Sequence, residues 1–235
     1  MKWNKKYNYP ASIRSVLMGT RHYNINNQML PSVTSILELT KSEEEKASLA
    51  AWKAKVGEKE SLRISGEAAQ RGSEMHAAIE SFLLGRDNLD LFEEEKKKNK
   101  SQLMADLIIN EALKPKLSEI YGVESCVYYP GSRGYSGQAD LIGVFDNIPS
   151  IIDFKQKNSI MKESYSSLQN YFTQLGGYSL AHNTVYGSNI TQGVILLATT
   201  DLVFQIFRIR DDKLIEYQKK FLDRVERYYA IKNKS

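Results

Sequence analysis

Cysteine is almost missing from the sequence, which has a single one, Cys126, among 235 residues. A lone cysteine excludes a disulfide within the chain, a cysteine-rich zinc site and an iron–sulfur cluster held by four cysteines of this chain. Long apolar runs are also missing, and none approaches the roughly 18 residues that cross a bilayer. The first residues, Met1-Lys2-Trp3-Asn4-Lys5-Lys6, precede no apolar core of the kind found in secretory signals. We therefore expect a cytoplasmic protein without a membrane partner.

Neither sign of charge dominates. The 32 lysines and arginines against 28 acidic residues give a formal net charge of +4 and a pI near 8.9. This mild excess permits a polyanionic partner without requiring one. Internal repeats, low-complexity tracts and a clear interdomain linker are lacking, so the length predicts one domain over residues 1–235. We expect residues 1–60 to form an N-terminal arm and helical extension, and residues 61–235 to form a core that ends in a helix.

The N-terminal half is expected to be mostly helical. Turn residues, caps and apolar spacing predict a small hairpin or arm over residues 22–27, a short helix beginning near Pro31, and helices over 42–57, 60–84 and onward to about 121. Ser42 and Glu45 match a capping box at the start of the second helix. Trp52, on the apolar stripe of that helix, is expected to pack in the core. The charged run within 86–100 is usual for a solvated helix face, although its lysines could also attract phosphate.

Strands and helices alternate in the C-terminal half. The expected strands cover residues 123–129, 137–145, 150–154, 191–198 and 203–209, and the expected helices cover 163–183 and 212–232. The first three strands form a meander. The fourth is reached through a helical crossover, so it should run parallel to its partner. The sequence therefore predicts an α/β fold with a central mixed sheet flanked by helices.

Two carboxylates and one ammonium group are expected to meet at one edge of this sheet. Asp153 and Lys155 are two apart in a strand and share a face, while Phe154 points to the other face. Asp140 lies on the neighbouring antiparallel strand. Such oxygen ligands suit Mg²⁺ or Mn²⁺ bound beside a phosphate, and Lys155 would orient or help deprotonate a water. An isolated D-x-K spacing is more often a pair of strand-end groups without this role.

Two helical pairs have a spacing that places them on one helix face. His76 and Glu80 are four apart, so both can reach a metal ion or its waters. By itself such a pair is more often a surface pair or a hydrogen-bonded histidine. Gln174 and Tyr178 are also four apart and face the same side of their helix.

Taken in order, these residues resemble the motifs of the PD-(D/E)XK nuclease superfamily. The matching stretches are Arg71-Gly72-Ser73-x-x-His76, Gly137-x-x-Asp140, Ile152-Asp153-Phe154-Lys155 and Gln174-x-x-x-Tyr178. The chain looks most like the RecB-type exonuclease branch, which includes a mitochondrial genome maintenance exonuclease and many phage exonucleases. The match runs from about Pro31 to Ala198. It implies a restriction-endonuclease-like core with an N-terminal helical extension.

The resemblance implies a catalytic set of His76, Asp140, Asp153 and Lys155. His76, Asp140, Asp153 and the Phe154 carbonyl would hold the metal. Lys155 would be the catalytic lysine, which stays charged beside two carboxylates and positions the water rather than acting as a free base.

The same resemblance implies roles outside the catalytic set. Arg71, Ser73, Gln174 and Tyr178 would contact DNA, and the last two would also order the site. Glu80 and Glu124 would support it, although each could equally form a structural ion pair. The cluster-binding members of the family use four cysteines, so this chain resembles the cluster-free members. Its implied cofactor is Mg²⁺ or Mn²⁺, with no iron–sulfur cluster.

The implied function is a metal-dependent DNA exonuclease that hydrolyses phosphodiester bonds of single-stranded DNA or DNA ends. It would act in recombination, repair or replication in a bacterium or a phage-infected host cell, with DNA and an unidentified recombination or replication protein as partners. Three alternatives stay open: a duplex-end or structure-specific nuclease, a non-catalytic nucleic-acid-binding module of the same fold, and a purely structural α/β protein in which the motifs are coincidental. The presence of Asp140, Asp153 and Lys155 argues against the second, because such modules typically lose these groups.

Overall fold

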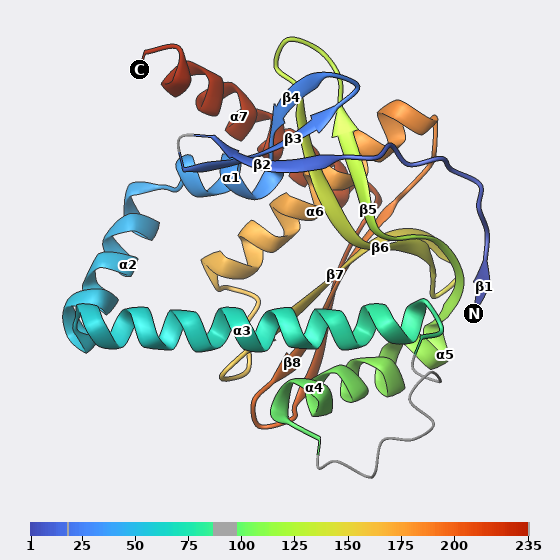
Figure 1. Cartoon of the computed structure of the whole chain (residues 1–235), viewed down its shortest axis with the longest axis horizontal. Helices are drawn as coiled ribbons and strands as arrows, with labels where there is room; N and C mark the ends of the chain where they lie inside the picture. Colours follow the sequence, from blue (N-terminus) through green and yellow to red (C-terminus); the bar gives the residue numbers. More distant parts are fainter. Residues whose placement is uncertain (18, 87–97, 235) are drawn as a thin grey trace.

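A six-stranded mixed sheet forms the centre of the computed structural model, which describes residues 1–17, 19–86 and 98–234 (Figure 1). The strands, in spatial order, are β1 (Lys2–Trp3), β5 (Leu117–Tyr129), β6 (Tyr135–Phe145), β7 (Ile148–Lys157), β8 (Gln192–Thr199) and β9 (Phe204–Arg210). Strands β5, β6 and β7 form the predicted antiparallel meander. Strand β8 pairs parallel with β7, as its helical crossover predicts, and β9 returns antiparallel.

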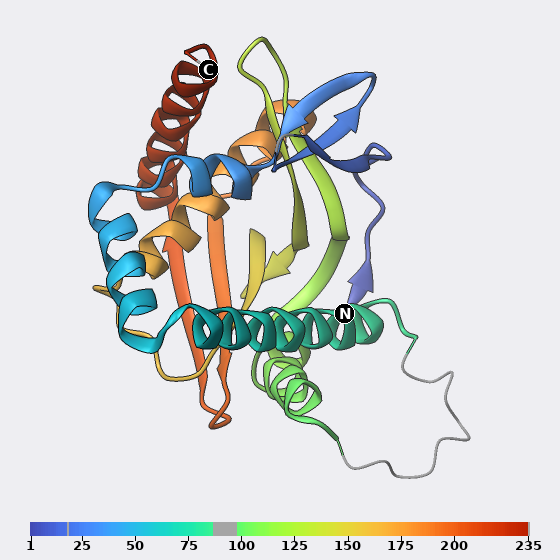
Figure 2. The same ribbon diagram turned by 60° about the vertical axis from the view of Figure 1, so that its left-hand side comes forward.

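Helices cover both faces of the sheet because its inner strands are apolar on both sides. One layer contains α1 (Val33–Leu39), α6 (Ser166–Tyr186) and α7 (Asp211–Lys232), and the other contains α3 (Glu58–Leu83), α4 (Lys100–Ile108), a π-helical segment η1 (Ile109–Leu113) and α5 (Lys114–Lys116). Ile151 of β7 belongs to the first core and its neighbour Ile152 to the second, since successive strand residues face opposite ways. Figure 2 shows α3 and α4 lying together on one side of the sheet. The predicted α/β fold, with a mixed sheet flanked by helices, is confirmed.

The N-terminal extension consists of a small sheet and a connecting helix. Strands β2 (Ile13–Leu17), β3 (Thr20–Ile25) and β4 (Gln28–Pro31) form a three-stranded antiparallel sheet. The predicted hairpin is confirmed, and its Asn26-Asn27 turn has positive φ at both residues, which asparagine tolerates. Helix α2 (Glu43–Val56) joins α1 to α3 at one side of the molecule (Figure 2). The predicted capping box of Ser42 and Glu45 is present at its start.

Three local predictions differ from the structure. Helix ends at Lys116 rather than near residue 121, because the residues after Pro115 enter β5 and pair with β6 six residues earlier than predicted. Residues 2–3, predicted to belong to the N-terminal arm, are part of the central sheet, where β1 pairs with β5. The prediction that Trp52 packs in the core is wrong, since α2 buries none of its residues and Trp52 is only half-buried.

Some of the sequence predictions concern residues outside the described ranges. Within the charged run at 86–100, residues 87–97 are outside them, so the interpretation of the Glu and Lys blocks there is untested. Of the run's described residues, Lys98 pairs with Asp106 and Asn99 caps α4. Among the helices that the structure describes, none is both long and apolar enough to cross a membrane.

Candidate active site

Asp140 and Asp153 lie where β6 and β7 stop pairing. The ladder between these strands ends with Leu141 opposite Ile152. Beyond this pair, the Phe154 N–H donates to Asp140 Oδ2 at 2.8 Å. The Asp140 side chain thus accepts a hydrogen bond that a backbone carbonyl of β6 would accept in a regular ladder. Both carboxyl groups are nearly enclosed, with Asp140 9% and Asp153 1% exposed. The point where the two strands diverge therefore brings together the two carboxylates that the sequence predicts to converge.

Lys155 lies on the same face as Asp153 and forms an ion pair with it. Its Nζ contacts Asp153 Oδ2, and only 19% of its side chain is exposed. Phe154 points the other way, into the core beneath α3 and α4. Burial lowers the pKa of Lys155, but the charges of Asp153 and Asp140 outweigh burial and raise that pKa. The site therefore holds a stable ammonium ion beside its carboxylates.

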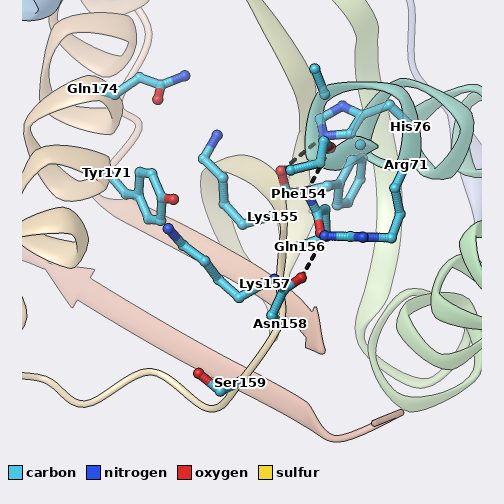
Figure 3. Close-up of a pocket in the computed structure, with 13 residues that line it drawn as sticks. Arg71, His76, Phe154, Lys155, Gln156, Lys157, Asn158, Ser159, Tyr171 and Gln174 are labelled. Atoms are coloured by element: carbon cyan, nitrogen blue, oxygen red, sulfur yellow. Dashed lines mark hydrogen bonds between the residues drawn. The ribbon is translucent and has the colours of Figure 1, made fainter. Parts of the chain in front are cut away.

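His76 reaches this point between β6 and β7 from α3, where Met75 and Ile79 anchor the helix in the core. The imidazole Nε2 lies 2.9 Å from the Phe154 carbonyl oxygen (Figure 3). A carbonyl can only accept, so Nε2 carries the hydrogen. The other nitrogen, Nδ1, lies 3.5 Å from Asp140 Oδ2. In the neutral ring Nδ1 then has a free lone pair that faces the carboxylates, which is how a histidine is presented to a metal.

Glu124 joins the group from β5. Its backbone has φ of 47°, in the left-handed region that a non-glycine residue rarely adopts, and β5 has register shifts against β6 just before this point. Burial, reinforced by Asp140, Glu80 and Asp153, raises the pKa of the Glu124 carboxyl to about 8. Burial and the Asp153 charge likewise raise the pKa of Asp140 to about 6. The fold thus confines several acids where water does not compensate their charge.

The donor set fits a divalent cation. Ligand atoms of His76, Glu124 and Asp140 all lie within 4.8 Å of one another. The two carboxylate oxygens suit both Mg²⁺ and Mn²⁺. The imidazole nitrogen suits Mn²⁺ but is a poor ligand for Mg²⁺. A bound cation would also relieve the mutual repulsion that raises the acids' pKa values.

The three residues of this group are not the same as the predicted metal ligands. Glu124, predicted as a supporting residue, has a ligand atom in the group. Asp153, predicted as a ligand, is turned toward Lys155, and the Phe154 carbonyl accepts the hydrogen bond of His76. Glu80 lies one turn further along α3 and pairs with Arg86 at 3.7 Å. The predicted roles of all these residues stay predictions.

Gln174 and Tyr178 of α6 support Asp153 from beneath. Gln174 Nε2 donates to Asp153 Oδ1 at 2.9 Å and to the Tyr178 hydroxyl at 3.2 Å. Both side chains are buried, at 9% and 3% exposure. A Cβ atom on Gly137 would lie 2.4 Å from the Tyr178 ring, so only glycine leaves room for the tyrosine there. The pair therefore orders the site, and its direct contact with DNA stays a prediction.

Two cavities meet at these residues. One, of about 400 Å³, lies over the carboxylates and is lined by Ser73 and by two residues of the N-terminal sheet, Arg14 and Arg21. The other, of about 620 Å³, lies on the far side of Lys155 and is lined by Arg71. Ala68, Ala69, Gly72, His76, Lys155 and Gln174 line both. Sequence reasoning missed Arg14 and Arg21, because no local pattern shows that the hairpin folds over the site.

Comparison with known proteins gives sequence relatives along most of the chain. It is 23% identical over 212 residues to mitochondrial genome maintenance exonuclease 1 of Mus musculus and 25% identical over 214 residues to the Homo sapiens protein of that name, in each case over 87% of this chain. The predicted relationship to exonucleases of the PD-(D/E)XK type is confirmed. The chain spans only 60% and 59% of the length of these two relatives. No protein-family model matches it.

The solved structures that match this chain do so with low TM-scores and low sequence identity. A candidate exonuclease from Eubacterium rectale has a TM-score of 0.44 at 17% identity and covers 71% of this chain and 67% of its own. A phage-related exonuclease from Haemophilus somnus has a TM-score of 0.29 at 16% identity and covers 70% of this chain and 83% of its own.

Proposed function

We propose that the chain is a metal-dependent DNA exonuclease that hydrolyses phosphodiester bonds of single-stranded DNA or DNA ends, with Mg²⁺ or Mn²⁺ as cofactor. The observation that carries the proposal is the Asp153–Lys155 ion pair beside the group of His76, Glu124 and Asp140. Its exonuclease relatives support the same chemistry. In this proposal residues 1–235 act as one nuclease domain, with residues 1–60 as the arm and helical extension.

The cation would be held by His76 Nδ1 and the carboxylates of Glu124 and Asp140, with Asp153 and the Phe154 carbonyl as further ligands at the same edge. When bound, it lowers the pKa of water and neutralises charge on the phosphate. The hydrogen bond to the Phe154 carbonyl keeps His76 in the tautomer that presents Nδ1.

Lys155 would position the attacking water and offset negative charge as it develops on the phosphate. Its ion pair with Asp153 holds the ammonium in place, and Gln174 holds Asp153 in turn. Hydrolysis forms a bond from the water oxygen to phosphorus and breaks the bond to the leaving oxygen, so one proton moves from the water to the leaving group. The raised pKa of Lys155 makes it a charge stabiliser rather than the acceptor of that proton.

The shape of the site favours a single strand. The two cavities meet beneath Ala68, Ala69 and Gly72, the small residues of α3 that line both. A basic space that is also lined by Tyr171 suits an extended backbone whose bases contact aromatic side chains. Arg71 on one side, and Ser73 and Tyr178 on the other, would contact that strand. Recombination, repair or replication in the cytoplasm of a bacterium or phage-infected cell is the proposed setting.

The test is digestion of end-labelled single-stranded and duplex DNA with Mg²⁺, Mn²⁺ or EDTA. Wild type, Lys155→Ala and a control, Lys219→Ala on the exposed face of α7, are compared. We expect metal-dependent release of labelled product by wild type and control, and none by Lys155→Ala. Equal cutting by Lys155→Ala would overturn the assigned site. Binding of DNA by wild type without cutting in either metal would establish the non-catalytic module instead.

A further inference from the structure

The larger of the two cavities carries more positive charge than the described contacts neutralise. Arg71, Lys155 and Lys157 line it, and none of its lining residues, all within the described ranges, is a carboxylate. Asp153 compensates Lys155 from below. Arg71 and Lys157 have no acidic partner within the parts of the chain that the structure describes. Arg71 and Lys157 therefore bring positive charge to the cavity that no ion pair with a described residue offsets.

Two hydrogen bonds fix the orientation of the Arg71 guanidinium. Its Nε donates to Gln156 Oε1 at 2.7 Å and its Nη2 donates to Asn158 Oδ1 at 2.6 Å (Figure 3). Both acceptors are neutral amides, so they orient the guanidinium without neutralising it. Gln156 is itself fixed, because its Nε2 donates to the Ala68 carbonyl at 2.8 Å. A preoriented guanidinium is well suited to a phosphate.

An aromatic ring faces the same space. Lys155 Nζ lies 4.9 Å and Lys157 Nζ 5.7 Å from the centre of the Tyr171 ring, and Figure 3 shows both side chains converging on it. Tyr171 is half-buried. Of the five α3 residues that line the cavity, three are small, Ala68, Ala69 and Gly72, and they take up little of its space. A flat apolar group could therefore lie between the ring and the helix.

These features together describe a nucleotide. We propose that the cavity of Arg71, Lys157 and Tyr171 is a subsite that binds one nucleoside monophosphate unit, with the phosphate at the two cations and the base or sugar against the tyrosine. Its volume of about 620 Å³ lies within the range of pockets that enclose small molecules. The inference rests on the proposed function, because the unit would be the nucleotide just beyond the bond that is cut. The released nucleotide should then act as a product inhibitor.

The subsite is tested by titration calorimetry of the whole chain in EDTA, so that binding does not depend on the metal. The probes are thymidine 5′-monophosphate, thymidine and inorganic phosphate. Wild type is compared with Lys157→Gln and Tyr171→Leu, and with matched controls Lys219→Gln and Tyr165→Leu at exposed positions. We expect wild type and controls to bind the nucleotide and each subsite variant to bind it about tenfold more weakly.

Each outcome decides for or against the subsite. Tighter binding of the nucleotide than of thymidine or phosphate, weakened in both variants, supports it. Failure of wild type to bind the nucleotide, equal binding by the variants, or binding no tighter than that of phosphate alone would overturn it. DNA digestion by the same preparations separates the two proposals: cutting without nucleotide binding overturns only the subsite, and nucleotide binding without cutting overturns only the exonuclease.

Discussion

Gln174 Nε2 donates a hydrogen bond of 2.9 Å to Asp153 Oδ1, and so links the middle of α6 to the carboxylate that holds Lys155. Asp153 Oδ2 accepts no hydrogen bond of good geometry from the described residues, although Lys155 lies against it as an ion pair. The orientation of this carboxylate therefore depends on a single amide and a single ammonium.

Gln174→Leu keeps the side-chain volume but removes the donor to Asp153. We expect DNA digestion to fall by about 10- to 100-fold, the usual effect of losing a group that orients a metal-site ligand. Tyr178→Phe removes only the hydroxyl that accepts from Gln174, so DNA digestion by this variant should fall only a few-fold. Single-turnover rates at saturating metal measure both, with thermal unfolding as a check on folding. Full activity in Gln174→Leu would show that Asp153 does not need this support.

Glu124→Gln should weaken Mn²⁺ binding at least tenfold, because it removes one of the group's ligand oxygens. Glu44→Gln, at an exposed position of α2, serves as the control and should change the affinity little. Calorimetric titration of Mn²⁺ measures both. If Asp153→Asn abolished binding while Glu124→Gln left it unchanged, the cation would be held by the Asp153 set and not by Glu124.

Gly137→Ala and Gly66→Ala should change stability in opposite directions. At Gly137 the added Cβ would lie 2.4 Å from the buried Tyr178 ring, and overpacking of this kind costs about 1–3 kcal/mol of unfolding free energy. At Gly66, an exposed position of α3, nothing lies within 4 Å. Alanine there should stabilise the helix by about 0.5–1 kcal/mol. Denaturant unfolding of both variants tests this, and equal values for the two would contradict it.

His182 should make the fold less stable in mild acid. Burial, aided by the charge of Lys6, lowers its pKa from 6.5 to about 4. As the pH falls below 6.5, His182 binds a proton in the unfolded chain but stays neutral in the folded chain. The unfolding free energy is therefore lost progressively down to about pH 4. The total loss of unfolding free energy between pH 6.5 and pH 4 is about 3 kcal/mol.

The folded ring is enclosed between two hydroxyl groups, since Tyr9 Oη lies 3.0 Å from Nε2 and Ser188 Oγ lies 2.7 Å from Nδ1. Unfolding free energies from pH 4 to 7 should show this slope in wild type and in His22→Gln. The slope should flatten in His182→Gln. An unchanged slope in that variant would assign the acid sensitivity to other groups.

Local periodicity alone was enough to predict much of the fold. The capping box of Ser42 and Glu45, the Asn26-Asn27 turn and the meander of β5, β6 and β7 are all present, since each depends on residues close in sequence. The two-residue spacing of Asp153 and Lys155 set their common face in the same way.

Contacts between distant segments could not be predicted from periodicity. The apolar stripe containing Trp52 indicated a buried face, but whether another element covers that face depends on the path of α2. The start of β5 at Leu117 depended on pairing with β6, which outweighed the helical pattern around Pro115. In both cases the preference of the local sequence was weaker than tertiary packing.

The sequence by itself placed Asp153 and Lys155 on one strand face beside Asp140, because strand spacing sets those directions. The family resemblance added His76 to this group. Only the tertiary structure decided what else reaches them. Glu124, predicted only as a supporting residue, brings its carboxyl group into the site from a position of β5 with left-handed backbone. Arg14 and Arg21 enter through a hairpin folded across from the N-terminus. The physical reason is that periodicity sets the direction of a side chain within its own element, whereas register, bulges and packing set which elements lie together.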